Sequence, residues 1–305
     1  MLRFGDFLLA IALFLSIILL TQIANAEWRG YAANVSASFA FALLLRCVEI
    51  VREAIYLSSF TRFFGRRFAK NQFFVVYPEF QLANDVRALT SKAGMDNQLL
   101  FEKADQLRQR SDTFRVDLET CAATNDVRAM IEVAALFSTA LREPSRIAPD
   151  GDWDRLQEEA LISIGFTSNY VTHNWLRLAS DRIVCVAEDE PATVRYGEFI
   201  KLITADPHAD EQVFKSDDSG EVGIIAKFRP DSQRPDIVWF FCAGVGPDAT
   251  VAASIFLSRK WRSLLHVFGE EDFLLVVRAL PGVVMHPRPL FAIQGGQSVP
   301  VEDLK

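Results

Sequence analysis

Residues 7–23 (FLLAIALFLSIILLTQI), together with the mostly apolar residues 31–51, decide how this 305-residue chain is organised. The first segment has 17 residues and no charge, close to the roughly 20 apolar residues that a membrane-spanning helix needs. Residues 30–45 are also uncharged, and Arg46 extends this second span because its long side chain can reach the interface. Two such segments in succession predict a transmembrane hairpin over residues 1–51.

A secretory signal peptide is the alternative for residues 1–26. Arg3, the apolar core and the Ala24-Asn25-Ala26 site fit such a signal, and its cleavage would leave one transmembrane helix. In either case the arginines that follow residue 45 are expected to face the cytoplasm, where Lys and Arg are enriched. We therefore expect a protein of the bacterial inner (plasma) membrane with a cytoplasmic C-terminal domain.

The segment that follows, residues 52–70, is expected to form a basic amphipathic neck beside the membrane. Arg62, Arg66 and Arg67 interleave there with phenylalanines, a composition that suits a helix lying on anionic lipid headgroups. The alternative is a connecting helix packed under the domain. Small residues recur every four positions earlier in the second span, and such a face can pack within the hairpin or between the subunits of a homo-oligomer. They are Ala32, Ser36 and Ala40.

The charge of the chain is uneven. Residues 1–70 carry eight Lys and Arg against four Asp and Glu. The whole chain has 32 and 39, so residues 71–305 carry 24 against 35, a net charge of −11. An acidic domain of this kind argues against general nucleic-acid binding, which needs a basic surface.

The cysteines and histidines show no metal-site spacing. Four of each are present, without a CxxC, HxH or HxxxH pattern, so we expect free thiols and neither a metal nor a cofactor.

Residues 71–305 are expected to form one cytoplasmic α/β domain. Short apolar strands alternate with helical stretches, which predicts a Rossmann-like, mostly parallel sheet with helices on both faces. One expected hairpin, residues 224–228 with 237–243, makes the sheet mixed. The other expected strands are residues 73–77, 113–118, 161–164, 183–187 and 273–279. The expected helices are residues 83–93, 99–110, 126–141, 169–179 and 250–268.

Two glycine-containing turns between a strand and a helix are the strongest candidates for a ligand site, because ligands bind beyond the carboxyl ends of the strands in such sheets. Free N–H groups at a helix N-terminus suit a phosphate or carboxylate. We expect the two turns to lie side by side, although each also fits a plain structural turn. Their candidate residues are Gly165, Thr167, Ser168, Asn169, Gly244, Gly246 and Asp248.

A repeated sequence, NDVRA, adds Arg87 and Arg128 as candidates to face an acidic ligand. Chance together with helix capping explains the repeat equally well. Weaker catalytic candidates are Glu79 and Glu119, which follow strands, and His173 as a general base. Carboxylates at such positions can accept hydrogen bonds from ribose or act in glycosidic cleavage.

The layout of the whole chain resembles bacterial proteins that join a short transmembrane hairpin to a cytoplasmic Rossmann-like sensor or effector domain, as in nucleotide-signalled anti-phage systems. This resemblance implies antiviral signalling through a nucleotide-like or phosphorylated ligand. We therefore expect a membrane-anchored ligand-binding module that rearranges or oligomerises on binding. The alternatives are a membrane-anchored enzyme acting on nucleotides or N-glycosides, and a protein-interaction module without a small ligand.

Overall fold

The computed structural model describes residues 11–15, 17–18, 26–78, 124–141, 143–166, 169–179, 199–202 and 212–304. The chain divides into two units, Met1–Phe60 and Thr61–Lys305. Each unit is described by itself.

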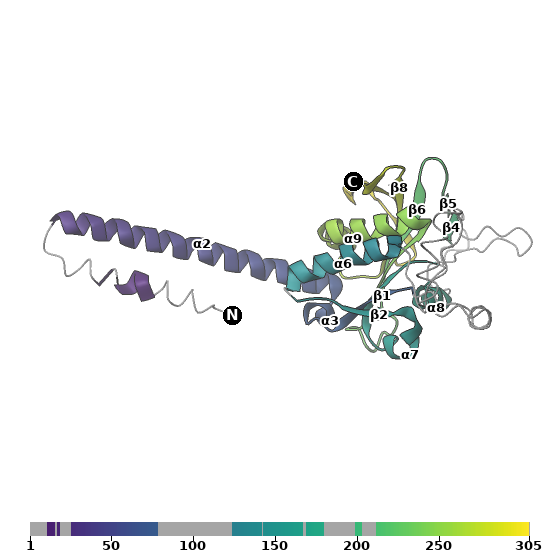
Figure 1. The fold of residues 1–305 in the computed structure, drawn as a ribbon, viewed down its shortest axis with the longest axis horizontal. Coiled ribbons are helices and arrows are strands. Elements are labelled where there is room, and N and C mark those ends of the chain that lie inside the picture. Colours follow the sequence, from purple (N-terminus) through teal and green to yellow (C-terminus); the bar gives the residue numbers. More distant parts are fainter. Residues whose placement is uncertain are drawn as a thin grey trace, which may run out of the picture. The chain divides into compact units, whose positions relative to one another are not determined.

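One long helix dominates the first unit. Helix α2 (Ala26–Phe64) contains 39 residues, and its final turn belongs to the second unit (Figure 1). Within the described residues, Ala33–Phe64 is the one stretch that is long and apolar enough to cross a membrane. Of the first predicted span, residues 11–15 and 17–18 are helical and the rest lies outside the described residues. The hairpin therefore remains a prediction.

The predicted neck is helical but its phenylalanines are not at a lipid surface. Helix α2 runs unbroken to Phe64, and helix α3 (Arg66–Ala69) follows after Gly65, which has a φ of 98°. In the second unit Phe63, Phe64 and Phe68 are all fully buried. This end of the neck is part of the protein core, as expected for a connecting helix packed under a domain.

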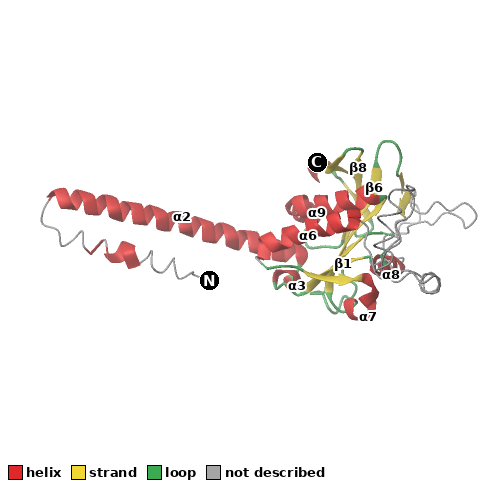
Figure 2. Cartoon of the chain, in the orientation of Figure 1, coloured by secondary structure: helices red, strands yellow, loops and turns green. Residues whose placement is uncertain are grey.

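The second unit is built on a mixed sheet with the strand order β10-β9-β8-β6-β7-β3-β1-β2 (Figure 2). The strands β1 (Phe73–Tyr77), β2 (Arg146–Pro149), β3 (Ala160–Ile164) and β7 (Trp239–Val245) pair in parallel. The antiparallel half consists of β6 (Glu221–Phe228), β8 (Phe273–Leu280), β9 (Val283–Gln294) and β10 (Gln297–Val299). A separate antiparallel pair is formed by β4 (Phe199–Leu202) and β5 (Gln212–Lys215).

The expected mixed α/β sheet is confirmed, but the expectation that it is mostly parallel is wrong. Four of the seven pairings in the described eight-stranded sheet are antiparallel. The cause is a set of hairpins near the C-terminus. The predicted β6–β7 hairpin is present, and a two-residue turn, Pro281-Gly282, joins β8 directly to β9. Whether the parallel half is Rossmann-like remains a prediction.

Helices cover both faces of this sheet. Helices α6 (Thr124–Leu141) and α9 (Pro247–Phe268) pack on each other, and α9 crosses β6, β7, β8 and β9 (Figure 1). The short α7 (Trp153–Leu156) and α8 (Tyr170–Ala179) lie on the opposite face, next to the single-turn helix η1 (Asp150–Asp152). A last turn, η2 (Glu302–Leu304), contacts α9.

Neighbouring side chains of strand β7 pack on opposite faces of the sheet. The ring centroid of Phe240 lies 5.5 Å from that of Phe63 and 5.1 Å from that of Phe64. Its neighbour Phe241 points to the other face, where Trp175 of α8 stacks on it at 4.0 Å. Successive strand residues face opposite sides. The end of α2 is therefore held by the same strand that carries α8 on its other face.

Charged groups tie the same region to the domain. The Arg67 guanidinium donates to Asp236 Oδ2 at 2.7 Å and to Glu159 Oε2 at 2.9 Å. The hydrogen bond from Arg67 lowers the pKa of the Asp236 carboxyl below its usual value. Arg67 is thus engaged by carboxylates of its own chain.

One edge of the sheet is only partly covered. Strand β10 pairs with residues 292–294 of β9, which leaves residues 283–291 of β9 with β8 as their described strand neighbour. This stretch contains Pro287 and Pro289, which have no backbone N–H.

Candidate functional site

The two predicted turns lie at the same edge of the sheet. Strands β3 and β7 are adjacent and parallel, with Ile164 opposite Cys242. The Gly165 N–H donates to the Cys242 carbonyl at 3.0 Å, so the turn after β3 lies against β7. Strand β7 continues to Val245 before its own turn begins. The structure therefore brings Gly165 and Asn169 to the edge at which β7 leads into Gly246 and Asp248.

The N-terminus of α8 is closed by the protein's own side chains. Asn169 is fully buried, and its Oδ1 accepts from the Val171 and Thr172 N–H groups at 2.9 and 3.1 Å. Its Nδ2 donates to the Ile164 carbonyl at 2.7 Å. The next donor, Tyr170 N–H, is taken by Asp150 Oδ2 at 2.7 Å. Asn169 is thus an N-cap, and these three N–H groups already have acceptors.

A carboxylate also closes the N-terminus of α9. Glu221 of β6 accepts the Ala249 N–H at 2.9 Å through Oε2. A Cβ added to Gly246, whose φ is 112°, would lie 2.4 Å from the Glu221 carboxyl carbon. Gly246 is therefore required so that Glu221 can approach the helix end. An anionic group already occupies the position that was predicted for an anionic ligand.

Gly244 serves close packing of the strand on the helix. A Cβ there would lie 2.4 Å from the Thr250 nitrogen and 2.5 Å from the Ala249 Cβ. Only hydrogen fits such a gap. The glycines of this turn thus have a structural explanation that needs no ligand.

The remaining predicted residues are not assembled with these turns in the described structure. Arg128 is exposed on helix α6. His173 lies on α8, and its side chain is not among those that the structure describes. The other candidates lie outside the described residues: Glu79, Arg87, Glu119, Thr167 and Ser168. Among the side chains that are described, no group of three or more His, Cys, Asp or Glu residues could hold a metal ion.

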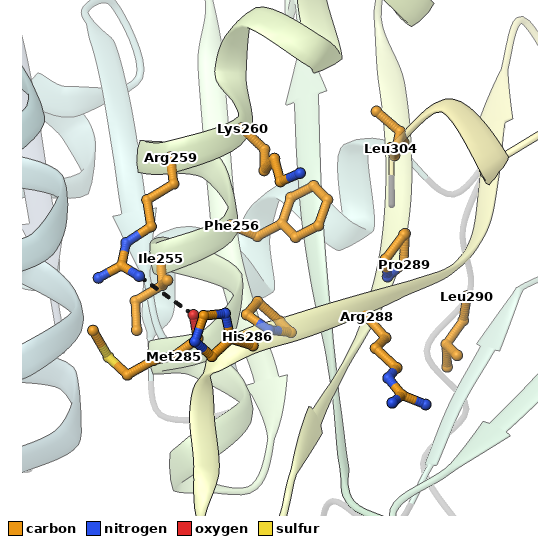
Figure 3. Close-up of a pocket in the computed structure, with 11 residues that line it drawn as sticks. Ile255, Phe256, Arg259, Lys260, Met285, His286, Arg288, Pro289, Leu290 and Leu304 are labelled. Carbon is orange, nitrogen blue, oxygen red and sulfur yellow. Dashed lines mark hydrogen bonds between the residues drawn. The ribbon is translucent and has the colours of Figure 1, made fainter.

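A pocket of about 870 Å³ lies instead between helix α9 and strand β9 (Figure 3). Its apolar lining includes Phe256 of α9, Pro289 of β9 and Leu304 of η2. The other lining residues are Ile255, Arg259, Lys260, Met285, His286, Pro287, Arg288 and Leu290. The pocket sits beside the stretch of β9 that β10 leaves uncovered.

The charge of this pocket is one-sided. Arg259, Lys260 and Arg288 are cationic, and none of the eleven lining residues is acidic. Arg259 and Lys260 reach from α9 toward β9, whereas Arg288 extends from β9 on the side away from α9 (Figure 3). Arg259 donates to the Met285 carbonyl at 3.4 Å. Two cations thus lie beside an apolar floor, with a third at the strand edge.

Sequence reasoning missed this pocket because it is lined by α9, β9 and η2, and β9 belongs to the antiparallel half of the sheet. Two signals point to it in retrospect. The pair Arg259-Lys260 follows the mostly apolar residues 251–257, and the run His286-Pro287-Arg288-Pro289 places prolines in a strand, where they occur at edges.

No family model, curated protein or solved structure matches this chain. The resemblance to membrane-anchored sensor and effector proteins therefore rests on the layout of the sequence. Function has to be argued from the geometry of the molecule.

Proposed function

We propose that this chain is a membrane-anchored protein whose α/β unit binds an anionic small ligand, nucleotide-like or otherwise phosphorylated. The observation that carries the proposal is the pocket between α9 and β9, whose lining is basic in a chain of net charge −7. A local excess of cations in an acidic protein favours an anionic ligand over random surface charge.

Helix α2 supports the anchor. Large apolar side chains are exposed over a broad part of its surface, including Val35, Phe41, Leu45 and Ile55. A helix with such a broad apolar surface is stable when that surface is covered by protein or by lipid. Within Ala33–Phe64, 6% of the 18-residue apolar window is buried in the protein, so lipid is the solvent that suits this apolar part of the helix.

The pocket suits a ligand with an apolar or aromatic part. Its volume of about 870 Å³ falls within the roughly 300–1,000 Å³ of typical small-molecule sites. Phe256, Pro289 and Leu304 offer an apolar floor, against which a planar ring can pack. Arg259 and Lys260 can then hold the phosphate, since hydrogen bonds from ionised donors are the stronger ones.

The glycine turns after β3 and β7 are a poorer position for this ligand. Their helix N-termini are closed by Asn169 and Glu221, and a phosphate would have to displace a carboxylate. We therefore place the ligand at α9 and β9. We further propose that ligand binding is signalled to a partner. This includes the anti-phage role that the layout of the sequence implies.

The test is binding of trinitrophenyl-ATP to the full-length chain in detergent micelles, followed by fluorescence. A double variant, Arg259→Gln with Lys260→Gln, removes both cations of α9. A charged hydrogen bond contributes about 1.5–3 kcal/mol, and each 1.4 kcal/mol is tenfold in affinity, so the variant should bind at least about a hundredfold more weakly. Arg262→Gln is the matched control, because Arg262 lies on the same helix and does not line the pocket. Equal binding by parent and double variant would refute the site.

A further inference from the structure

Helix α2 carries a row of large apolar residues that continues past the point where lipid can cover it. Five of them are spaced three and four residues apart and are between 57% and 62% exposed. They are Phe41, Leu44, Val48, Val51 and Ile55. This spacing repeats every seven residues and places all five on one stripe of the helix. We call these residues the seam.

With the anchor proposed above, and with Arg46 at the interface, we expect the second half of the seam to lie outside the hydrocarbon. Arg46, Glu49, Arg52 and Glu53 put four charged residues within eight positions, too many for the apolar interior of a bilayer. Arg46 and Glu49 pair at 2.7 Å on the helix surface. The uncharged span, residues 30–45, therefore ends where these charges begin, and Val48, Val51 and Ile55 need another cover.

The helix cannot tip into the membrane interface to cover them. Residues 26–64 form one continuous helix, so residues 46–60 leave the span along the same axis. At a rise of 1.5 Å per residue, this segment extends about 22 Å beyond the hydrocarbon. Exposed aliphatic side chains on such a rod are stabilised by a partner helix that carries the same stripe.

We propose that the seam packs against the seam of a second copy of this chain, as a short parallel coiled coil. The proposal rests on the membrane anchor proposed above, because anchoring gives two copies the same orientation and hence parallel helices. Leu44 followed by the β-branched Val48 matches the alternation of leucine and β-branched residues that favours two-stranded parallel packing, and Val51 departs from it. Asn34 falls seven residues before Phe41 on the same stripe, where an amide can bond to its counterpart and fix the register.

Size and charge agree with this occupant. A side chain of this kind buries about 100 Å² of apolar surface, so the three seam residues beyond the span remove about 600 Å² from water in two copies. With Phe41 and Leu44, which pack together within the lipid, the contact reaches about 1,000 Å², near the lower bound of a specific interface. The charged residues Arg46, Glu49 and Glu53 fall on the outer side of the stripe, so like charges do not meet. The anchor raises the local concentration of copies, which compensates for the short length.

Disulfide cross-linking of the full-length chain in native membranes tests this packing. The parent for the series is Cys47→Ser, which removes an exposed thiol next to the seam and keeps the other three cysteines. Single substitutions Val48→Cys, Val51→Cys and Ile55→Cys should move the 34.3 kDa band to twice that mass on oxidation. The matched outer substitutions Arg46→Cys, Glu49→Cys and Glu53→Cys should stay at the level of Cys47→Ser.

Two outcomes overturn the proposal. Equal cross-linking at seam and outer positions would mean random collision, and no cross-linking at the seam would mean that lipid or the chain's own N-terminal segment covers it. Extraction of the membranes with alkaline carbonate is run alongside. Release of the chain by carbonate would refute the anchor, while cross-linking of the purified chain in detergent still decides the seam.

Discussion

Lys227 is the buried cation whose removal should change stability most clearly. It lies on β6, is 2% exposed, and donates to the Glu270 carbonyl at 2.7 Å. Burial, and to a smaller extent the nearby charge of Arg229, lowers its pKa from 10.5 to about 8. The carboxylates around it, at residues 270, 271 and 272, and the face of the Phe63 ring at 5.2 Å favour the charged form. We consider the variant Lys227→Met, which keeps the volume and removes the amine.

The direction of the pH dependence follows from the pKa of Lys227 in the folded chain and in the unfolded chain. Between pH 8 and 10.5 the unfolded chain holds a proton on this amine that the folded chain has released, so the free energy of unfolding rises with pH in this window. Each pKa unit corresponds to 1.36 kcal/mol, and the lowering from 10.5 to about 8 corresponds to about 3 kcal/mol. Below pH 8 this group contributes no further change. The parent should therefore gain about 3 kcal/mol from pH 8 to 10.5 relative to Lys227→Met.

At pH 7 the variant should be the more stable protein. It loses a hydrogen bond from an ionised donor to the Glu270 carbonyl, worth about 1.5–3 kcal/mol, and removes a charge whose burial costs about 3 kcal/mol, so the net gain is small. The assay is thermal unfolding of the full-length chain in detergent, followed by tryptophan fluorescence. For a domain of this size, 1 kcal/mol shifts Tm by roughly 2–4 °C, so the Tm of the variant relative to the parent should fall by roughly 6–12 °C between pH 7 and 10.5.

A matched control is Lys70→Met, which removes an exposed lysine. A difference in Tm between parent and Lys227→Met that stays constant from pH 7 to 10.5 would show that the amine is not desolvated in the fold. Lys227 would then not be buried against the Phe63 ring as the structure has it.

Three further substitutions test the core and the helix ends by the same thermal unfolding. Phe64→Ala should cost about 3–5 kcal/mol because its ring is fully buried among other aromatic rings, and a loss below 1 kcal/mol would place it at a solvent or lipid surface. Asn169→Ala should cost about 0.5–2 kcal/mol as a lost N-cap, and Asn169→Asp, which keeps the acceptor for the helix N–H groups, should recover part of it. Glu221→Gln should cost about 0.3–1 kcal/mol through the lost charge at the α9 N-terminus, and the difference should shrink in high salt.

Local sequence pattern predicted the elements that pack internally. The apolar run at residues 73–77 is strand β1, and the expected helix at 126–141 is α6 with two more residues at its start. Strand β1 buries four of its five residues, and α6 buries Ala129, Val133 and Phe137 along one stripe, so their periodicity reports their surroundings.

The antiparallel half was harder to predict because its signals are turns and not apolar runs. Strand β9 contains two prolines and exposed polar residues, which a search for apolar strands passes over. The Pro281-Gly282 turn, with Gly282 at a φ of 70°, marks the β8–β9 hairpin by turn chemistry alone.

The closure of the helix N-termini at the candidate site could not be predicted, for a different reason. Sequence could place the glycine turns at one sheet edge, and the structure agrees. It could not show that Asn169 and Glu221 from the same chain would close the helix ends there. Glu221 lies 28 residues before Ala249 in the chain, so only the β6–β7 pairing brings it to α9.

The uncovered stretch of β9 has a consequence for a protein that is held on a surface. Molecules confined to a membrane meet edge-on far more often than molecules in free solution, and an open strand edge is a template for aggregation through added strands. Pro287 and Pro289 have no N–H to donate to an added strand. Arg288, between them, would repel Arg288 of a second copy. Replacing the two prolines would therefore cause aggregation in the crowded membrane before it lowered the stability of the fold.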